Sequence, residues 1–229
     1  MDFGVYDGLV ATIYELGSRA TGHSRFPKTF FKQAGLPPLP DTKPIRVLEA
    51  GCGTLRWTLG LTEALQKQGK LNDVIIDAFD ASERMLRTAE KKADKKGIWS
   101  KVQLWLADGQ NLSRDARAFY GGQVNGMYKT FHKENYHIGI TSGLLEVIPN
   151  WRSAIKDFNE RIMPSGYIIL SLVNNNPTGD LASKTLRFKI RKAKDVLPEF
   201  EGVEFQKIPV KTFTGYMEKL KTIYVGKKL

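Results

Sequence analysis

The chain has a single cysteine, Cys52, so it cannot form an internal disulfide bond. Its three histidines, at positions 23, 132 and 137, are scattered and form no cluster with the ligand spacing of a metal site. Apolar runs are all too short to span a membrane, and the first residues lack the basic and apolar segments of a secretory signal. We therefore expect a cytoplasmic protein with no bound metal and no transmembrane segment.

Acidic residues are scarce relative to basic ones. The chain has 24 Asp and Glu against 35 Lys and Arg, a formal net charge of +11. This balance favours acidic partners such as nucleic acid, anionic lipid headgroups or phosphorylated small molecules, but a solvated basic surface gives the same count. With 229 residues, 41% of them hydrophobic, the chain can form one α/β domain with additions or two small domains.

A strand, a glycine turn and a helix organise the sequence. The apolar run 45–48 predicts a buried strand, and Glu49 follows it directly. Gly51 and Gly53 then form a turn without Cβ atoms, on which a nucleoside can lie directly against the backbone. Leucines continue at helical spacing through residues 55–69, and Arg56 stands near the position of the third glycine of a dinucleotide-binding turn.

Strands and helices alternate along the rest of the chain. Strands are predicted at 45–50, 74–79, 102–106, 137–141 and 167–173, and helices at 27–34, 55–69, 83–96, 112–120, 151–162 and 180–196. Residues 121–135 are expected to be a loop, and the stretches 203–210 and 219–225 to pair as antiparallel strands. This alternation predicts a mostly parallel sheet with helices on both faces.

Polar residues follow the predicted strands. Glu49, Asp80, Asp108 and Thr141 each lie at the end of one of the first four strands. The carboxyl ends of parallel strands share one edge of the sheet, and ligands of such sheets bind there. We therefore expect a ligand site at this edge.

Four blocks resemble the class I S-adenosylmethionine-dependent methyltransferases. They are Val47–Thr54, Ala78–Leu86, Leu106–Leu112 and Leu144–Asn150, the last followed by Ile162–Tyr167. The resemblance implies a Rossmann-like fold with a seven-stranded, mostly parallel sheet, helices on both faces and an antiparallel last strand. Residues 41–229 would form this domain, and residues 1–40 a helical cap or lid, with a packing extension as the alternative. Tyr6-Asp7 and Tyr14 are faintly similar to the N-terminal helices of quinone-biosynthesis methyltransferases.

The resemblance also implies the residues that bind S-adenosylmethionine. Asp80 would accept hydrogen bonds from both ribose hydroxyls, and Asp108 one from the adenine amino group. Glu49 would orient the amino-acid end. The remaining contacts would come from Gly51 and Cys52 and Gly53 in the turn, Ala81 and Met85 on the ring, Gly109 beside the adenine, and Thr141 and Ser142 beside the sulfonium. Leu55-Arg56 replaces a further glycine that the family often has.

Catalytic residues are less clearly marked. Glu146 is the best candidate for a carboxylate that faces the substrate, and a carboxylate at the entry of a helix is its alternative role. Tyr14 and His23 are weaker candidates. No Asn-Pro-Pro-Tyr sequence follows the fourth strand, which disfavours exocyclic amines of nucleic-acid bases as acceptors.

The sequence therefore predicts a methyltransferase that acts on a small-molecule acceptor by in-line transfer. The alternatives are an RNA methyltransferase, or a non-catalytic basic binding protein with the same fold. Six basic residues between Lys184 and Lys194 are the feature that keeps nucleic acid open as a partner.

Overall fold

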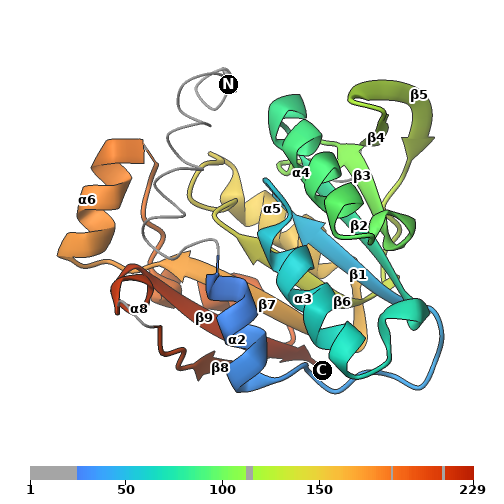
Figure 1. Cartoon of the computed structure of the whole chain (residues 1–229). Helices are drawn as coiled ribbons and strands as arrows, with labels where there is room; N and C mark the ends of the chain where they lie inside the picture. The colour runs from blue at the N-terminus through green and yellow to red at the C-terminus, as the bar shows by residue number, and fades with distance from the viewer. Residues whose placement is uncertain (1–24, 112–115, 187, 213–214) are drawn as a thin grey trace.

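A computed structural model of the chain describes residues 25–111, 116–186, 188–212 and 215–229 (Figure 1). These residues form one mixed sheet of nine strands, in the order β5-β4-β3-β2-β1-β6-β7-β9-β8. The strands are β1 Ile45–Ala50, β2 Val74–Asp80, β3 Val102–Leu106, β4 Ala116–Tyr120, β5 Gln123–Lys129, β6 Tyr136–Ser142, β7 Ile162–Val173, β8 Val203–Ile208 and β9 Lys221–Lys228. The helices are α2 Phe26–Ala34, α3 Arg56–Lys67, α4 Glu83–Lys95, α5 Trp151–Asn159, α6 Pro177–Leu186, α7 Ala193–Val196 and α8 Tyr216–Leu220.

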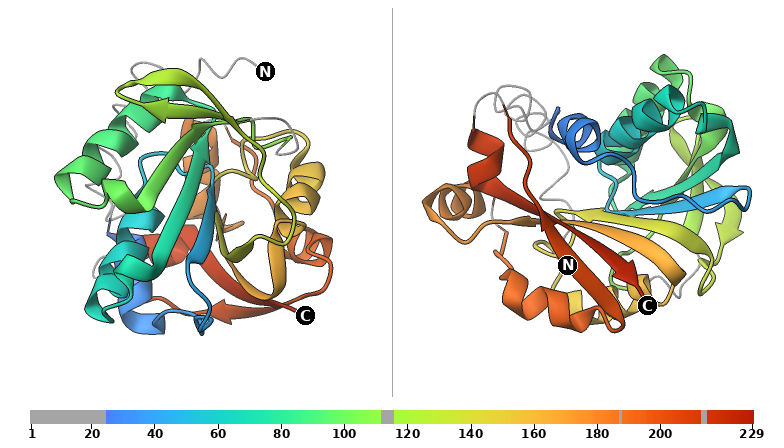
Figure 2. Two further views of the ribbon diagram at one scale, coloured as in Figure 1. Left: turned by 90° about the vertical axis from the view of Figure 1, so that its right-hand side faces the viewer. Right: turned by 90° about the horizontal axis from the view of Figure 1, so that it is seen from below.

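Strands β3, β2, β1, β6 and β7 run parallel to one another and form the centre of the sheet. Strand β9 pairs antiparallel with β7, and β8 with β9, as expected for the end of the chain. Helices cover both faces of the sheet (Figure 2). Helices α2, α3, α4 and α8 contribute to one hydrophobic core, and α5 and α7 to the other. The predicted doubly covered α/β architecture is therefore confirmed.

The sheet has two more strands than predicted. Strands β4 and β5 form a hairpin that pairs with β3, so the predicted helix at 112–120 is wrong over residues 116–120, and the predicted loop at 121–135 contains a strand. Gly121 and Gly122, with φ of 64° and 75°, make the turn between them. The Glu90 carboxylate of α4 accepts hydrogen bonds from both of their backbone N–H groups, at 2.6 and 2.8 Å. These contacts hold the hairpin tip against the domain.

Helix α2 belongs to the core of the domain. Its Phe26, Phe30 and Phe31 are buried, and their rings lie 5.5–6.5 Å from the ring of Trp57 on α3. The predicted helix 27–34 is thus confirmed. Residues 1–24, which would form the rest of the expected cap, lie outside the described residues.

The basic stretch does not form one helix from 180 to 196, as predicted. Helix α6 ends at Leu186, and residues 188–192 run as irregular chain before α7. Hydrogen bonds to the loop after β6 explain the break. The Lys189 backbone N–H donates to Glu146 O at 3.0 Å, and the Arg191 guanidinium donates to Leu145 O and Ile148 O at 3.1 and 3.2 Å.

A buried carboxylate joins four strands on the α5 side of the sheet. Asp77 of β2 is 1% exposed and accepts hydrogen bonds from Trp105 Nε1 at 2.8 Å, Tyr136 OH at 3.0 Å and Lys129 Nζ at 2.5 Å. Burial and the Asp77 charge raise the pKa of Tyr136, so this phenol stays protonated and donates. The four side chains tie β5 to β2, β3 and β6.

Candidate functional site

The turn after β1 has the left-handed backbone that glycine favours. Gly51 and Gly53 have φ of 67° and 50°, and a Cβ built on Gly53 would meet no atom of the described residues within 4 Å. The Cys52 N–H donates to Phe79 O of β2 at 2.8 Å, and its buried thiol fills space under the turn. The turn is thus fastened to the neighbouring strand, and no described residue covers Gly53.

Leu55 completes the turn in a conformation that leucine rarely adopts. Its φ of 61° and ψ of 29° are left-handed, and its side chain is fully buried. A left-handed residue with a Cβ costs roughly 1–2 kcal/mol. The backbone therefore keeps the shape of a glycine turn although the expected further glycine is absent, and core burial of Leu55 offsets the strain.

Asp80 connects the turns that follow β1 and β2. Its Oδ2 accepts a hydrogen bond from Gly53 N at 2.8 Å, and its Oδ1 accepts one from Ser82 N at 2.9 Å. The Ser82 hydroxyl in turn caps α4 by accepting from Met85 N at 3.3 Å. Gly53 and Asp80, both predicted to bind the cofactor, are therefore in direct contact, and Ala81 lies between two residues of this network.

Glu49 is a buried carboxylate at the carboxyl end of β1. It is 2% exposed and accepts hydrogen bonds from the Thr58 backbone N–H at 3.0 Å and from the Thr58 hydroxyl. Burial raises the pKa of Glu49 from its ordinary value of 4.5 to about 7, while the Thr58 hydrogen bonds act in the opposite direction. A nearby cation would favour the ionised form of this group.

Replacing Glu49 with glutamine should make stability less dependent on pH. A carboxyl whose pKa is raised in the folded state stabilises the protein below pH 4.5, and this contribution is lost as the pH rises through about 7. The difference corresponds to roughly 3 kcal/mol at most. We expect Glu49→Gln to be more stable than the wild type by about 1–3 kcal/mol at pH 8, and equal to it near pH 4. Urea unfolding at both pH values measures this; an equal gain at pH 4 would contradict it.

Asp108 and Gly109 form the turn after β3. Asp108 is exposed, and its Oδ1 accepts a hydrogen bond from Gln110 N at 2.9 Å. A Cβ on Gly109 would lie 3.0 Å from Leu144, and a Cβ on Gly51 would meet the same side chain at 3.0 Å. Leu144 therefore packs between the two turns, and a side chain at either position would press against it.

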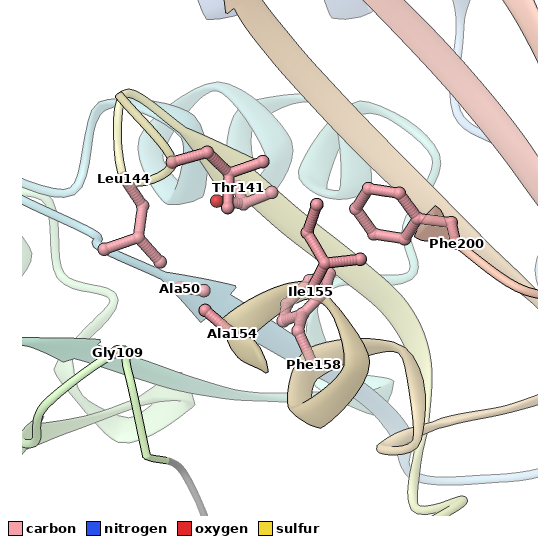
Figure 3. A pocket seen from close by; sticks show the side chains of 9 residues that line it. Ala50, Gly109, Thr141, Leu144, Ala154, Ile155, Phe158 and Phe200 are labelled. Carbon is pink, nitrogen blue, oxygen red and sulfur yellow. The ribbon is translucent and has the colours of Figure 1, made fainter. Parts of the chain in front are cut away.

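A small pocket lies on the α5 side of this edge. Figure 3 shows its lining side chains, with Ala154, Ile155 and Phe158 from α5 opposite Leu144 and Thr141. Gly109 and Ala50 border it, but neither Glu49 nor Asp80 does. Its lining is almost entirely apolar, so the pocket is a gap in the core beside the site and lacks polar groups for a ribose.

The end of β6 brings together polar side chains from distant parts of the sequence. Thr141 and Ser142 end the strand, and Glu146 lies in the following loop, 3% exposed, with Oε1 accepting from Val173 N at 3.0 Å. Helix α5 begins only at Trp151, so Glu146 does not mark a helix entry, which was its alternative role. It clamps the loop to the end of β7.

Sequence reasoning missed Lys221, which joins this group. Its Nζ donates to Ser142 Oγ at 3.0 Å, and the residue is 7% exposed. The sequence held one indication of this. Lys221 alternates with Ile223 and Val225 in a predicted strand, so its side chain should point to the same inward-facing side of the sheet as theirs.

Other candidates fall away from this edge. His137 lies at the beginning of β6, where its Nδ1 accepts a hydrogen bond from Arg46 N at 3.0 Å. Tyr14 and His23 lie outside the described residues, so their roles stay predictions. In the part of the chain that the structure describes, no three His, Cys, Asp or Glu side chains are grouped as metal ligands would be. No helix in that part is long and apolar enough to cross a membrane.

Comparison with known proteins gives consistent matches. Residues 23–211 match the family model described as a methyltransferase domain. A demethylmenaquinone methyltransferase of Staphylococcus epidermidis is 27% identical over 133 residues, which are 58% of this chain and 44% of that relative. The chain thus spans less than half the length of this curated relative.

Solved structures share the fold. A SAM-dependent methyltransferase from Thermotoga maritima has 16% identity and a TM-score of 0.63, with 98% of each chain covered. The [4+2]-cyclase SpnF has 12% identity and a TM-score of 0.55, with 92% of this chain and 80% of that chain covered. The same fold therefore supports more than one reaction.

Proposed function

The chain belongs to the methyltransferase-domain family, and from this premise we propose that it transfers a methyl group from S-adenosylmethionine to a small-molecule acceptor. The predicted family, Rossmann-like fold and cofactor are confirmed by the family match. The observation that carries the proposal is the contact between Asp80 and Gly53, because it joins an acceptor-only carboxylate to an open glycine turn at the carboxyl edge of the sheet.

The chemistry of these residues fits the cofactor. Asp80 would hold the ribose hydroxyls, since a carboxylate is an acceptor-only group that can take hydrogen bonds from two hydroxyl donors at once. Glu49 would attract the cationic amino-acid end. Asp108 and Gly109 would border the adenine, with Ala81 and Met85 on the other side of the ring. The turn Gly51, Cys52 and Gly53 would lie under the cofactor.

When bound, S-adenosylmethionine supplies a methyl group already activated by a positively charged sulfonium. The residues of this chain then have to orient the acceptor in line with that methyl group and exclude water, which proximity and burial can supply. Thr141 and Ser142 would border the methyl group from the end of β6. A general base is required only for an acceptor that loses its proton during attack.

The choice of a small molecule over RNA rests on the curated relatives, and part of the basic stretch has a structural role. Arg191 is engaged with two backbone carbonyl groups of the loop after β6 and stacks 5.5 Å from the ring centre of Trp151. The half-buried Arg191 therefore supports the domain, whereas four lysines of the same stretch are exposed. The curated relatives are named for a small-molecule acceptor, demethylmenaquinone, which is consistent with this choice.

Label transfer tests the function directly. The protein is incubated with methyl-tritiated S-adenosylmethionine and either a metabolite extract or total RNA, at about 0.15 M salt, where exposed charges are screened beyond about 8 Å. We expect label in small molecules and only background label in RNA. Because a cyclase shares this fold, label in neither fraction would contradict the methyltransferase proposal even if the cofactor binds.

A charge-reversal variant distinguishes an RNA acceptor from a small-molecule acceptor. Changing the exposed Lys184, Lys189, Lys192 and Lys194 to Glu should leave small-molecule labelling unchanged, whereas RNA label lost in this variant would support the RNA alternative.

We also propose that the segment before α2 is a lid over the acceptor. Deleting residues 2–24, which keeps the packed α2, should then abolish transfer and leave cofactor affinity within a few-fold; full activity would refute the lid.

A further inference from the structure

Lys221 lies beside the end of β6, where Thr141 and Ser142 would border the methyl group. It is the first residue of β9 and pairs with Val173, the last residue of β7. Its side chain shares a sheet face with Ile223 and is 7% exposed. Strand β7 adjoins β6, so Lys221 is carried to the edge at which Thr141 and Ser142 end.

The ammonium group has few partners in this position. Ser142 Oγ, at 3.0 Å, is its one hydrogen-bond acceptor within the described part of the chain, although an ammonium has three donors. Ser142 lies opposite Ser171 in the sheet, and the buried Ser171 Oγ has no hydrogen-bond partner among the described residues. Among the described residues, a Cβ on Gly143 would meet only Lys221 Nζ within 4 Å, at 4.0 Å, so no described group fills the space beside the amine.

The surrounding charges do not fully compensate the positive charge of the Lys221 ammonium group. Burial lowers the pKa of Lys221, the Glu146 carboxylate counteracts this, and the positive charge of Arg56 adds to the lowering. The Glu146 carboxylate also interacts with other groups. Its Oε1 accepts a hydrogen bond from Val173 N, and its negative charge acts on Arg191 as well. A second anion beside Lys221 would therefore be stabilised.

Resting on the proposed methyl transfer, we propose that Lys221 and Ser142 bind an ionised hydroxyl oxygen of the acceptor, so that the acceptor is a phenol or an enol and not an amine. The hydroxyl proton leaves to water when the acceptor ionises. The electron pair of the anion then forms the bond to the methyl carbon, and the pair of the breaking carbon–sulfur bond stays on sulfur. Such an acceptor needs no general base in the transfer step.

A coloured anion tests this subsite. The probe is 4-nitrophenol, whose phenolate absorbs visible light and whose neutral form does not, added to the full-length protein saturated with S-adenosylhomocysteine. We expect the probe to bind as the phenolate at a pH where free 4-nitrophenol is mostly neutral. Lys221→Met should weaken binding at least tenfold, and 4-nitroaniline, the matching amine, should not bind to the wild type.

Lys227→Met is the matched control, because Lys227 is an exposed lysine on the same strand, and it should bind like the wild type. Lys221→Gln replaces the methionine variant if thermal unfolding shows that the latter is not folded. Equal binding by the Lys221 variant, binding of the neutral phenol, or absence of binding while S-adenosylhomocysteine still binds would each overturn the subsite. Failure of the wild type to bind S-adenosylhomocysteine would instead overturn the proposed function.

Discussion

Replacing Asp80 with alanine is expected to weaken S-adenosylmethionine binding by about 2–4 kcal/mol, a factor of roughly 30 to 900. The variant loses the charged acceptor proposed for the ribose hydroxyls. It also leaves the Gly53 and Ser82 N–H groups without the carboxylate that joins their turns. Both losses act on the cofactor site, so the fold should persist while affinity falls. Titration calorimetry with S-adenosylhomocysteine measures the effect.

Two further variants separate the causes. Asp80→Asn keeps the shape of the side chain and one acceptor oxygen. It should therefore retain part of the hydrogen bonding that holds the turns together and bind S-adenosylhomocysteine with intermediate affinity. Asp94→Ala removes an exposed carboxylate of α4 and should bind as the wild type does. Unchanged affinity in Asp80→Ala would show that the ribose is bound elsewhere.

Replacing Asp77 with alanine is expected to cost about 3–5 kcal/mol of stability. The change leaves the Lys129 ammonium, the Trp105 indole N–H and the Tyr136 hydroxyl without their common acceptor in a buried layer. A domain of this size has a total stability of roughly 5–15 kcal/mol, so the expected loss is a substantial fraction of it. Urea denaturation followed by circular dichroism gives the free energy of unfolding.

Tyr136→Phe provides the matched comparison. It removes one donor from Asp77 and leaves the carboxylate with its other two partners, so the expected loss is only about 1 kcal/mol. A loss in Asp77→Ala no larger than that of Tyr136→Phe would show that the carboxylate does not act as a common acceptor.

The central strands could be predicted because each is an apolar run bounded by clear stop signals. The hairpin of β4 and β5 could not, because alanine-rich residues 116–119 suit a helix as well as a strand. Gly121-Gly122 between two alternating stretches was nevertheless a hairpin signal. The continuous basic helix failed because Arg191 bonds to backbone groups more than 40 residues away, which no local pattern encodes.

The residues of the site also differ in whether the sequence alone could identify them. Glu49, Asp80 and Asp108 could be found since each directly follows a recognisable strand, and the structure places them at the ends of adjacent strands β1, β2 and β3. Lys221 could not be assigned to the site, because its approach to Ser142, 79 residues away, depends on the antiparallel pairing of β7 with β9.

The left-handed Leu55 makes the shape of the cofactor turn depend on the packing of the hydrophobic core. A glycine at this position would not create that dependence. A glycine would adopt this backbone without help, whereas Leu55 holds it only while its side chain stays packed in the core with Phe30 and Leu61. Loosening that core, by mild heating or by a substitution that creates a cavity beneath α3, would release the turn toward ordinary backbone angles. Cofactor affinity in this protein would then report on the integrity of its hydrophobic interior, and would decline before the sheet itself unfolds.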